Sequence, residues 1–237
     1  MFLKEFRNQL KFGGWRAALI FAGFRFMNRI MYFDILHTMT LELKNIDSKY
    51  LKDPEAPIVG RFLTPEEIKK FSKNSKYQLT NDFLPESLDH GDMCFGFVDG
   101  DVLAAYGWYS KKPTRVTNEF AVNFSNDWVY MHHGYTNPDY RGKRLHAIGM
   151  AKAVAAFQEQ GYRGLVSIVA SENSNSLKSV KRMGYELTGK IYLFARLNRY
   201  LVYQDKGAKD CGMWLSPRHE TLNAYVMNRP ENDRSAA

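Results

Sequence analysis

Residues 137–146 read Asn-Pro-Asp-Tyr-Arg-Gly-Lys-Arg-Leu-His, and this basic turn governs how the rest of the chain is interpreted. It follows an extended run at residues 127–135 (DWVYMHHGY) and precedes a helical pattern over residues 145–160. The first turn of a helix carries unpaired backbone N–H groups and a partial positive charge. A strand, a turn rich in Arg and Lys and a helix start therefore predict a phosphate-binding site. A solvated loop entering an ordinary helix is the alternative explanation.

The basic turn contains no Walker pattern and no dinucleotide-binding G-x-G-x-x-G fingerprint. It resembles the acyl-CoA-binding motif of the GNAT acetyltransferase superfamily, R/Q-x-x-G-x-G/A, preceded by Pro138 and Tyr140 as in many members. Arg144 and His146 stand where the motif has its two glycines. The motif binds through backbone N–H groups, which every residue except proline supplies. The resemblance implies that the CoA pyrophosphate binds Arg141, Gly142, Lys143, Arg144, Leu145 and His146.

A second segment farther along the chain carries the same resemblance. Residues 164–170 (GLVSIVA) form an apolar run that predicts a buried strand. After this strand, GNAT enzymes often carry the motif N-x-x-A/S and a short helix. An apolar residue, a glycine and an aromatic residue then follow the helix. The residues on that spacing are Asn173, Ser176, Met183, Gly184 and Tyr185. Asn173 and Ser176 are thus expected at the CoA site, although Asn173 also suits a helix cap and Gly184 a helix end.

The order of patterns predicts a mixed α/β (α+β) fold: a GNAT-like antiparallel and parallel sheet with helices on both faces, plus an N-terminal helical arm. The expected strands are residues 56–63, 93–98, 102–110, 119–124, 127–135, 164–170 and 187–196. The expected helices are residues 64–73, 84–90, 145–160 and 174–183. We expect three segments: an arm at residues 1–45, an acyltransferase domain at 46–228 and a disordered tail at 229–237.

The net charge of +8 and the isoelectric point of about 9.3 suit acidic partners such as CoA phosphates or anionic lipid. No zinc-finger, RNA-stacking or helix-turn-helix signature occurs, so nucleic acid is not an expected partner. Two cysteines are too few for a disulfide scaffold, which favours a reducing cytoplasm. His132 and His133 are adjacent, so on a strand they point to opposite faces. Only one of them can face the cleft, and they cannot share a metal, so no metal site is expected.

Residues 1–40 are aromatic, basic and poor in acid, and Gly13-Gly14 divides them into a short helical piece and a longer one from Trp15 to about Met39. Their longest uncharged run, residues 17–24, is too short to span a bilayer. One interpretation is an interfacial helix that places arginines at lipid headgroups and apolar side chains in the acyl boundary. The other is a helix packed on the domain or on a second copy, as in a homodimer. The residues assigned to the lipid interface are Trp15, Arg16, Leu19, Phe24, Arg25, Phe26, Met27 and Arg29.

The resemblance implies direct transfer, in which an amine attacks the thioester of bound acyl-CoA. The pantetheine would pair with the strand before the basic turn, at Gly134, Tyr135 and Thr136. A histidine on that strand suits the general base because its pKa lies near neutrality. His133 is preferred, and His132 and Glu119 are further candidates. Val180 stands where many members have the Tyr general acid, which leaves Tyr185 as the catalytic candidate and Tyr192 as a weaker one.

The leading hypothesis is an acetyl-CoA-dependent N-acyltransferase acting on a primary amine of a small molecule or of a sugar or lipid precursor. A binding or scaffold module of weak catalytic power is the first alternative, favoured by Val180 and the two replaced glycines. A long-chain N-acyltransferase whose arm shelters the acyl chain is the second. The expected location is the cytoplasm, with the inner face of the membrane as an alternative station for residues 1–40.

Overall fold

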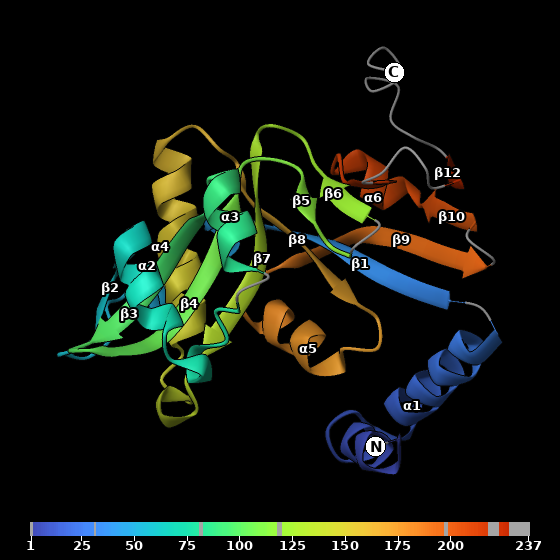
Figure 1. Cartoon of the computed structure of the whole chain (residues 1–237), viewed down its shortest axis with the longest axis horizontal. Coiled ribbons are helices and arrows are strands. Elements are labelled where there is room, and N and C mark those ends of the chain that lie inside the picture. Colours follow the sequence, from blue (N-terminus) through green and yellow to red (C-terminus); the bar gives the residue numbers. More distant parts are fainter. Residues whose placement is uncertain are drawn as a thin grey trace. The chain divides into compact units, whose positions relative to one another are not determined.

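The computed structural model describes residues 2–30, 32–80, 83–117, 120–196, 199–217 and 223–227, and Figure 1 labels their helices and strands. The chain forms two compact units. Unit 1 comprises residues 1–40, 113–125 and 168–237, and unit 2 comprises residues 41–112 and 126–167.

Unit 2 is built on a mixed sheet. Its strands are β2 (Val59–Phe62), β3 (Met93–Asp99), β4 (Val102–Ser110), β7 (Trp128–Thr136) and the first part of β8 (Gly164–Ala170). Their order is β8-β7-β4-β3-β2. The pairs β2–β3, β3–β4 and β4–β7 are antiparallel, whereas β7 and β8 run parallel. This arrangement agrees with the predicted antiparallel and parallel sheet.

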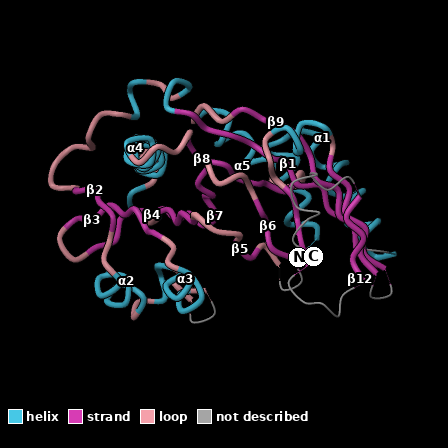
Figure 2. The backbone as a smooth tube through the Cα atoms, turned by 90° about the horizontal axis from the view of Figure 1, so that it is seen from above, coloured by secondary structure: helices cyan, strands magenta, loops and turns pink. Residues whose placement is uncertain are grey.

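Helices cover both faces of this sheet, as predicted. Figure 2 shows α4 (Leu145–Glu159) on one face and α2 (Pro65–Ser72) and α3 (Leu84–His90) on the other. On the α4 face, the Phe157 ring lies 5.7 Å from Phe62 and 5.5 Å from Tyr109. The covalent order strand, basic turn, helix places the start of α4 directly after β7. The sheet thereby fixes both sides of the basic turn.

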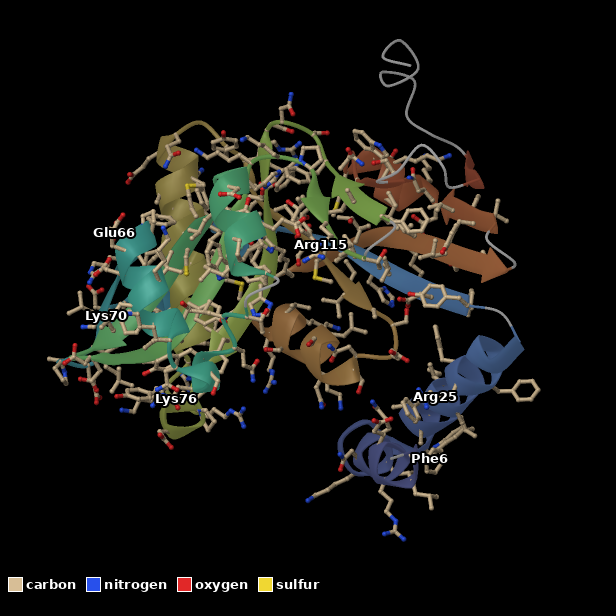
Figure 3. All side chains as sticks on the ribbon, viewed as in Figure 1. Phe6, Arg25, Glu66, Lys70, Lys76 and Arg115 are labelled. Atoms are coloured by element: carbon tan, nitrogen blue, oxygen red, sulfur yellow. The ribbon has the colours of Figure 1, made fainter. Side chains whose placement is uncertain are left out.

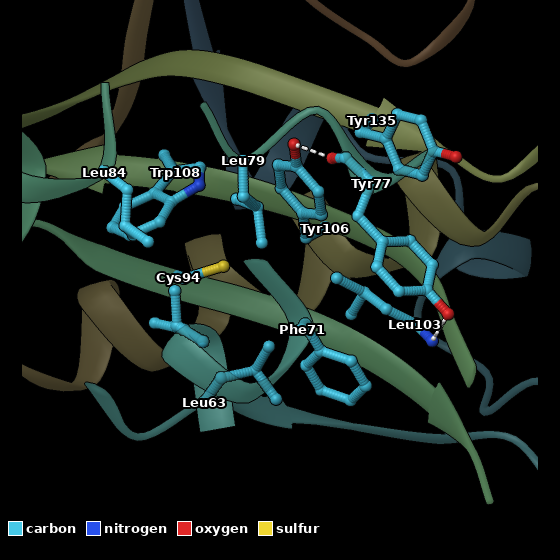
Figure 4. Packing of buried hydrophobic residues seen from close by; sticks show 11 residues of the cluster. Leu63, Phe71, Tyr77, Leu79, Leu84, Cys94, Leu103, Tyr106, Trp108 and Tyr135 are labelled. Carbon is cyan, nitrogen blue, oxygen red and sulfur yellow. Dashed lines mark hydrogen bonds between the residues drawn. The ribbon is translucent and has the colours of Figure 1, made fainter. Parts of the chain in front are cut away.

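The α2/α3 face holds an aromatic core, drawn in Figure 4. Tyr106 Oη donates a hydrogen bond to the Tyr77 carbonyl at 2.8 Å, and Tyr77 Oη accepts one from Leu103 N at 3.2 Å. Each buried phenol therefore keeps a polar partner inside an apolar layer, as buried polar groups require. Trp108 and Cys94 are fully enclosed in the same layer. Burial of such large side chains contributes roughly 1.5–3 kcal/mol each.

Local sequence signals position the α2 end of this layer. Thr64 Oγ1 accepts from Glu67 N at 3.3 Å, and Glu67 Oε2 accepts from Thr64 N at 2.9 Å, which completes the expected capping box. Lys70, labelled in Figure 3, pairs at 2.7 Å with Asp101 in the turn between β3 and β4. The cap and the ion pair together hold α2 against the β3–β4 hairpin.

Unit 1 contains two further sets of strands. In the first, β1 (Tyr32–Glu42) pairs antiparallel with β9 (Glu186–Arg196), β9 antiparallel with β10 (Arg199–Gln204), and β10 parallel with β12 (Asn223–Met227). In the second, β6 (Phe120–Asn123) lies between β11 (Trp214–Pro217) and β5 (Thr114–Arg115). Its helices are α1 (Phe2–Ile30), α5 (Ser174–Arg182) and α6 (Lys206–Asp210).

The expected extent of the arm helix was wrong. It was predicted to reach Met39, but α1 ends at Ile30, and residues from Tyr32 onward form β1. The reason is tertiary: β1 gains a full antiparallel ladder with β9, from Tyr32↔Ala195 to Thr40↔Glu186. Such pairing outweighs a weak helical pattern. Gly14, at φ 76°, breaks the helix as the sequence suggested.

The first half of α1 is tied to the start of α5 within unit 1. Gln9 Nε2 donates to the Glu172 carbonyl at 3.3 Å, and Ser174 Oγ donates to Gln9 Oε1 at 2.9 Å. In the described part of the chain, no helix is both long and apolar enough to cross a membrane. The expected tail at residues 229–237 lies outside the described residues.

Candidate active site

The basic turn is anchored at both ends. Asn137 N donates to the Ala104 carbonyl of β4 at 2.9 Å, and the Asn137 side chain accepts from Asp139 N at 3.3 Å. Residues Pro138–Tyr140 form the 3₁₀ turn η4. Tyr140 Oη donates to Asp99 Oδ2 at the end of β3, at 2.7 Å. The turn is thus held on the β3–β4 hairpin before any ligand arrives.

Arg144 adopts a left-handed backbone conformation, with φ 59° and ψ 17°. It is the N-cap of α4, and its own side chain makes no capping hydrogen bond. Side chains other than glycine pay roughly 1–2 kcal/mol in this region. Gly142 is also left-handed, at φ 87°. The turn therefore keeps the backbone shape that glycine at position 144 would favour, although Arg144 replaces it.

The cations of the turn are exposed. Arg141, Lys143 and Arg144 all lie at the surface, and none forms an ion pair within 4.0 Å of a described acidic group. Lys143 Nζ lies 5.0 Å from the centre of the Tyr140 ring, which the turn itself supplies. Exposed positive charge next to uncapped helical N–H groups attracts a phosphate anion.

His146, at the other replaced glycine, points between α4 and the sheet. A Cβ built on Gly134 of β7 would lie 2.3 Å from His146 Cε1. The ring also donates to the Tyr106 backbone, but burial outweighs this bond and lowers the pKa of His146 to about 4. The imidazole is therefore neutral at pH 7. The His146 ring packs against Gly134 next to the basic turn and adds no charge to that turn.

One edge of β7 has little strand pairing. On one side β7 pairs with β4 as far as Thr136. On the other it pairs with β8 over Trp128–Tyr130 only, and Ser167 Oγ then donates to the Met131 carbonyl at 2.8 Å. Gly134, Tyr135 and Thr136 follow along this edge. An extended edge offers backbone N–H and C=O groups to an amide-bearing ligand.

A β-bulge lies in β7 at the two histidines. Gly107 pairs with Gly134 and Tyr109 with Met131, so Trp108 alone faces both His132 and His133. Such a bulge breaks the alternation of side chains. The Phe83 ring lies 5.7 Å from His132 and 4.7 Å from His133.

The expectation that only one histidine faces the site was therefore wrong. Tyr130 stacks on His132 at 5.8 Å, and Tyr106 stacks on His133 at 5.9 Å. Both imidazoles lie on the α2/α3 face of the sheet. The bulge inserts one extra residue into β7, so that two adjacent side chains share one face. Burial, together with the nearby His132, lowers the pKa of His133. Among the described residues no group of His, Cys, Asp and Glu is arranged to hold a metal ion.

A comparison with protein families identifies the family of this chain. The model of the acetyltransferase (GNAT) family matches residues 60–185, more than half of the 237 residues. The chain belongs to the GNAT acetyltransferase family. Members of this family bind acyl-CoA, and the match includes β7, the basic turn and α4. A comparison with curated proteins finds no match.

Solved structures of the same GNAT fold are distant in sequence. A GCN5-related N-acetyltransferase-like protein from Streptococcus suis is 13% identical, with a TM-score of 0.48, over 70% of this chain and 62% of that one. A putative GNAT acetyltransferase from Novosphingobium aromaticivorans is 15% identical, with a TM-score of 0.44, over 68% and 62%. The chain thus spans less than two thirds of these two proteins. The aminoglycoside acetyltransferase AAC(6')-Iy is 17% identical, with a TM-score of 0.44, over 55% and 92%.

The remaining residues expected at a GNAT site lie in unit 1, whereas the basic turn belongs to unit 2. Asn173 is the N-cap of α5, and its Oδ1 accepts from Ser176 N at 3.1 Å. Tyr185 is buried before β9, and Tyr192 is half-buried against Tyr203 at 5.8 Å. Glu119 lies outside the described residues.

Two neighbours of the histidines escaped the sequence analysis. Phe83 precedes α3 and touches both imidazoles, and Asp92 follows α3 with its carboxylate 3.2 Å from His132. Neither residue lies in a motif. The only signal in the sequence was Gly91, which suggests a helix end that turns the chain back toward the sheet.

Proposed function

We propose that the chain is an acyl-CoA-dependent N-acyltransferase that moves an acetyl group directly from CoA to a primary amine. The observation that carries this proposal is the basic turn of a GNAT-family chain, with its left-handed Arg144, uncapped α4 and exposed cations. Those features favour the CoA pyrophosphate over other anions, because the adjoining β7 edge suits an amide-bearing arm. Arg141, Lys143 and Arg144 supply charge, while the backbone from Gly142 to His146 supplies N–H donors.

The pantetheine arm is assigned to β7 at Gly134, Tyr135 and Thr136, where the strand lacks a β8 partner. Asn173 and Ser176 remain a proposed second contact to the same ligand. This route leads the thioester from the basic turn along β7 toward the bulge. The reaction therefore takes place beside His132 and His133, where Phe83 packs against Trp108 and both imidazoles.

The chemistry needs a group that accepts a proton from the amine. A neutral imidazole does so, and His132 and His133 both lie beside the route assigned to the thioester. His132 shares the same face of the sheet. Glu119 and Tyr185 stay weaker candidates for proton transfer. With Val180 in place of the usual Tyr, water protonates the departing thiolate.

The acceptor is proposed to be a small-molecule amine, with the enzyme in the cytoplasm and α1 resting on the inner membrane surface. Trp15, Leu19 and Phe26 are 63%, 58% and 66% exposed. Their spacing of four and seven residues puts them on one side of the helix. Arg16 and Arg25 are also exposed (Figure 3 labels Arg25), which suits anionic headgroups. Phe24 does not join them as expected, because it is buried against Phe33 at 5.3 Å.

Thermal unfolding with CoA, acetyl-CoA, longer acyl-CoAs, ATP and NAD tests the donor. A ligand that binds only the folded protein stabilises it by ~2.7 kcal/mol at a hundredfold excess over its Kd. We expect a rise in Tm with CoA species alone, largest for acetyl-CoA. A larger rise with long acyl chains would indicate the long-chain transferase, and CoA binding without transfer to any amine would indicate a binding module.

Arg141→Glu sharpens this test, because the reversed charge repels phosphate. We expect CoA affinity to fall about tenfold, or ~1.4 kcal/mol. Lys69→Glu on the exposed side of α2 changes net charge equally and serves as the matched control. Equal losses in the two variants would mean that only the overall charge matters, and the basic turn would lose its assignment.

A further inference from the structure

A buried carboxylate lies beside the bulge and has no part in the function proposed above. The Asp92 side chain is 3% exposed. Its Oδ1 lies 2.7 Å from His90 Nδ1, and its Oδ2 lies 3.2 Å from His132 Nε2. Ser110 Oγ approaches His90 Nδ1 at 3.3 Å. Two imidazoles and a hydroxyl thus surround one carboxylate on the α2/α3 face of the sheet.

The fold holds Asp92 in place through its backbone. Gly91 ends α3 in a left-handed conformation, at φ 83°, and its N–H bonds the Leu88 carbonyl at 3.1 Å. Asp92 N then donates to the Ser87 carbonyl at 2.9 Å. This helix ending leaves the Asp92 side chain little freedom. His132 meets it because the bulge turns that ring onto the same face.

The carboxylate is charged despite its burial. Burial alone raises the pKa of Asp92, but the neighbouring His132, Ser110 and His90 lower it below its ordinary value. Lys112 lies close to this cluster, and its Nζ donates to the His90 carbonyl at 3.0 Å. The His132 side chain is 8% exposed, and its Nε2 is the ring nitrogen that faces the carboxylate.

His133 lacks such support. Its ring packs between Phe83 and Tyr106, and its Nε2 is buried without a hydrogen-bond partner among the described residues. Both burial and the nearby His132 lower its pKa. Charging this ring would place an imidazolium in an apolar layer without a counter-charge, which is costly. His133 is therefore the poorer proton acceptor of the two.

We propose that Asp92 positions His132 as the general base of the acyl transfer, while His90 holds the second oxygen of the carboxylate. This inference rests on the proposed acyltransferase function and reverses the sequence-based preference for His133. Nε2 of His132 faces Asp92 as a donor, which leaves Nδ1 with the lone pair that accepts the proton. The His132 ring lies within ion-pair distance of the carboxylate, although its Nε2–H is not aligned for a hydrogen bond. Asp92 is a positioning residue, because it acts through His132.

The protons balance in this scheme. The acceptor ammonium loses one proton to His132 Nδ1, and its nitrogen then attacks the thioester carbonyl carbon. The C–N bond forms, the C–S bond breaks, and the second proton of the nitrogen passes through water to the thiolate, which leaves as free CoA. His132 Nδ1 then gives its proton to solvent as the amide leaves, which restores the starting tautomer. One proton reaches solvent for each amide formed.

Nitrogen-15 NMR of the histidine rings in the full chain tests this pairing without any acceptor. We expect the wild-type His132 ring to carry its proton on Nε2, and Asp92→Asn to mix the two tautomers, because the carboxylate that holds Nε2–H is lost. Asp89→Asn, on the exposed side of α3, is the matched control and should leave the ¹⁵N pattern of His132 unchanged. Should Asp92→Asn fail to fold, the wild-type ring answers the same question, since its Nε2 must carry the proton.

A mixed tautomer of His132 in the wild type, or an Asp92→Asn ring with the wild-type ¹⁵N pattern, would overturn the proposal. CoA binding separates this failure from failure of the proposed function. If acetyl-CoA raises the Tm of Asp92→Asn as it does for wild type, the donor site stands on its own. We further expect His132→Ala to lower acetyl transfer to n-butylamine ~10²-fold with an unchanged KM for acetyl-CoA, and His133→Ala to lower it less.

Discussion

The imidazole of His146 occupies the space that any side chain at position 134 would need. A Cβ on Gly134 would lie 2.3 Å from His146 Cε1 and 3.0 Å from His146 Nε2. The glycine of β7 and the histidine that replaces a motif glycine in α4 are therefore a matched pair. The His146 side chain fills the space that Gly134 leaves beside β7. The turn between them contains the left-handed Arg144.

Gly134→Ala tests this pairing. We expect it to destabilise the protein by about 1–3 kcal/mol, because an added methyl overpacks the contact with His146. Chemical denaturation measures the loss, and His146→Ala combined with Gly134→Ala should restore part of it. The matched control is Gly23→Ala in α1, where a Cβ meets nothing within 4 Å. A loss at position 134 that stays the same in the His146→Ala background would contradict the pairing.

Arg144→Gly should separate stability from binding. Glycine relieves the left-handed strain at φ 59°, so we expect a gain of roughly 0.5–1 kcal/mol in the free energy of unfolding. The same change removes one cation from the basic turn and should weaken CoA binding several-fold, measured by calorimetry. Gln78→Gly, at φ 56°, is a control that relieves similar strain outside the turn. If Gln78→Gly weakened CoA binding as much, the charge of Arg144 would not be the cause.

Local chemistry made much of unit 2 predictable. The Thr64–Glu67 capping box, the turn at Gly100 and the buried run at residues 164–170 each act within a few residues, and the structure has the corresponding elements. Motif spacing likewise located the basic turn, because its strand and helix follow one another along the chain. The family match to residues 60–185 covers the same region.

Contacts between distant segments could not be predicted in this way. β1 is a strand because β9 pairs with it, and β11 depends on β6, which lies far away in the chain. The bulge at His132 and His133 arises from the register with β4, which no pattern within β7 reveals. The contact between His132 and Asp92 depends on that bulge. The histidine pair was recognised, while its geometry and its carboxylate partner required the fold.

Stability should fall as the pH drops from about 6.5 to 4, in part because of His146. Its folded pKa of about 4 lies below the ordinary value of 6.5, so the unfolded chain binds a proton first. The stabilisation is complete above pH 6.5 and is lost as the pH falls toward 4. We expect His146→Ala to flatten this slope by about 1–3 kcal/mol over that range. His133 and His37, whose pKa values are also lowered, contribute with the same sign and remain in the variant.

Denaturant unfolding at a series of pH values measures that slope. An Ile148→Ala variant is the control, because it truncates a buried apolar side chain of the same helix and removes no titratable group. Parallel pH curves for wild type and His146→Ala would mean that the imidazole is as readily charged in the folded protein as in the unfolded chain. The burial of His146 under Gly134 would then not govern its protonation.

The exposed stripe of α1 should bind anionic membranes. Trp15, Leu19 and Phe26 share one side of the helix, while Ala18 and Phe21 are buried on another. We expect the triple change of the stripe to Ser to abolish flotation with vesicles of phosphatidylglycerol and phosphatidylcholine, and Arg16→Glu with Arg25→Glu to weaken it. Leu51→Ser and Val59→Ser, at exposed apolar residues of unit 2, supply the control. Wild-type protein that ignores vesicles and sediments as a dimer, with the triple variant a monomer, would assign the stripe to a second copy of the chain instead.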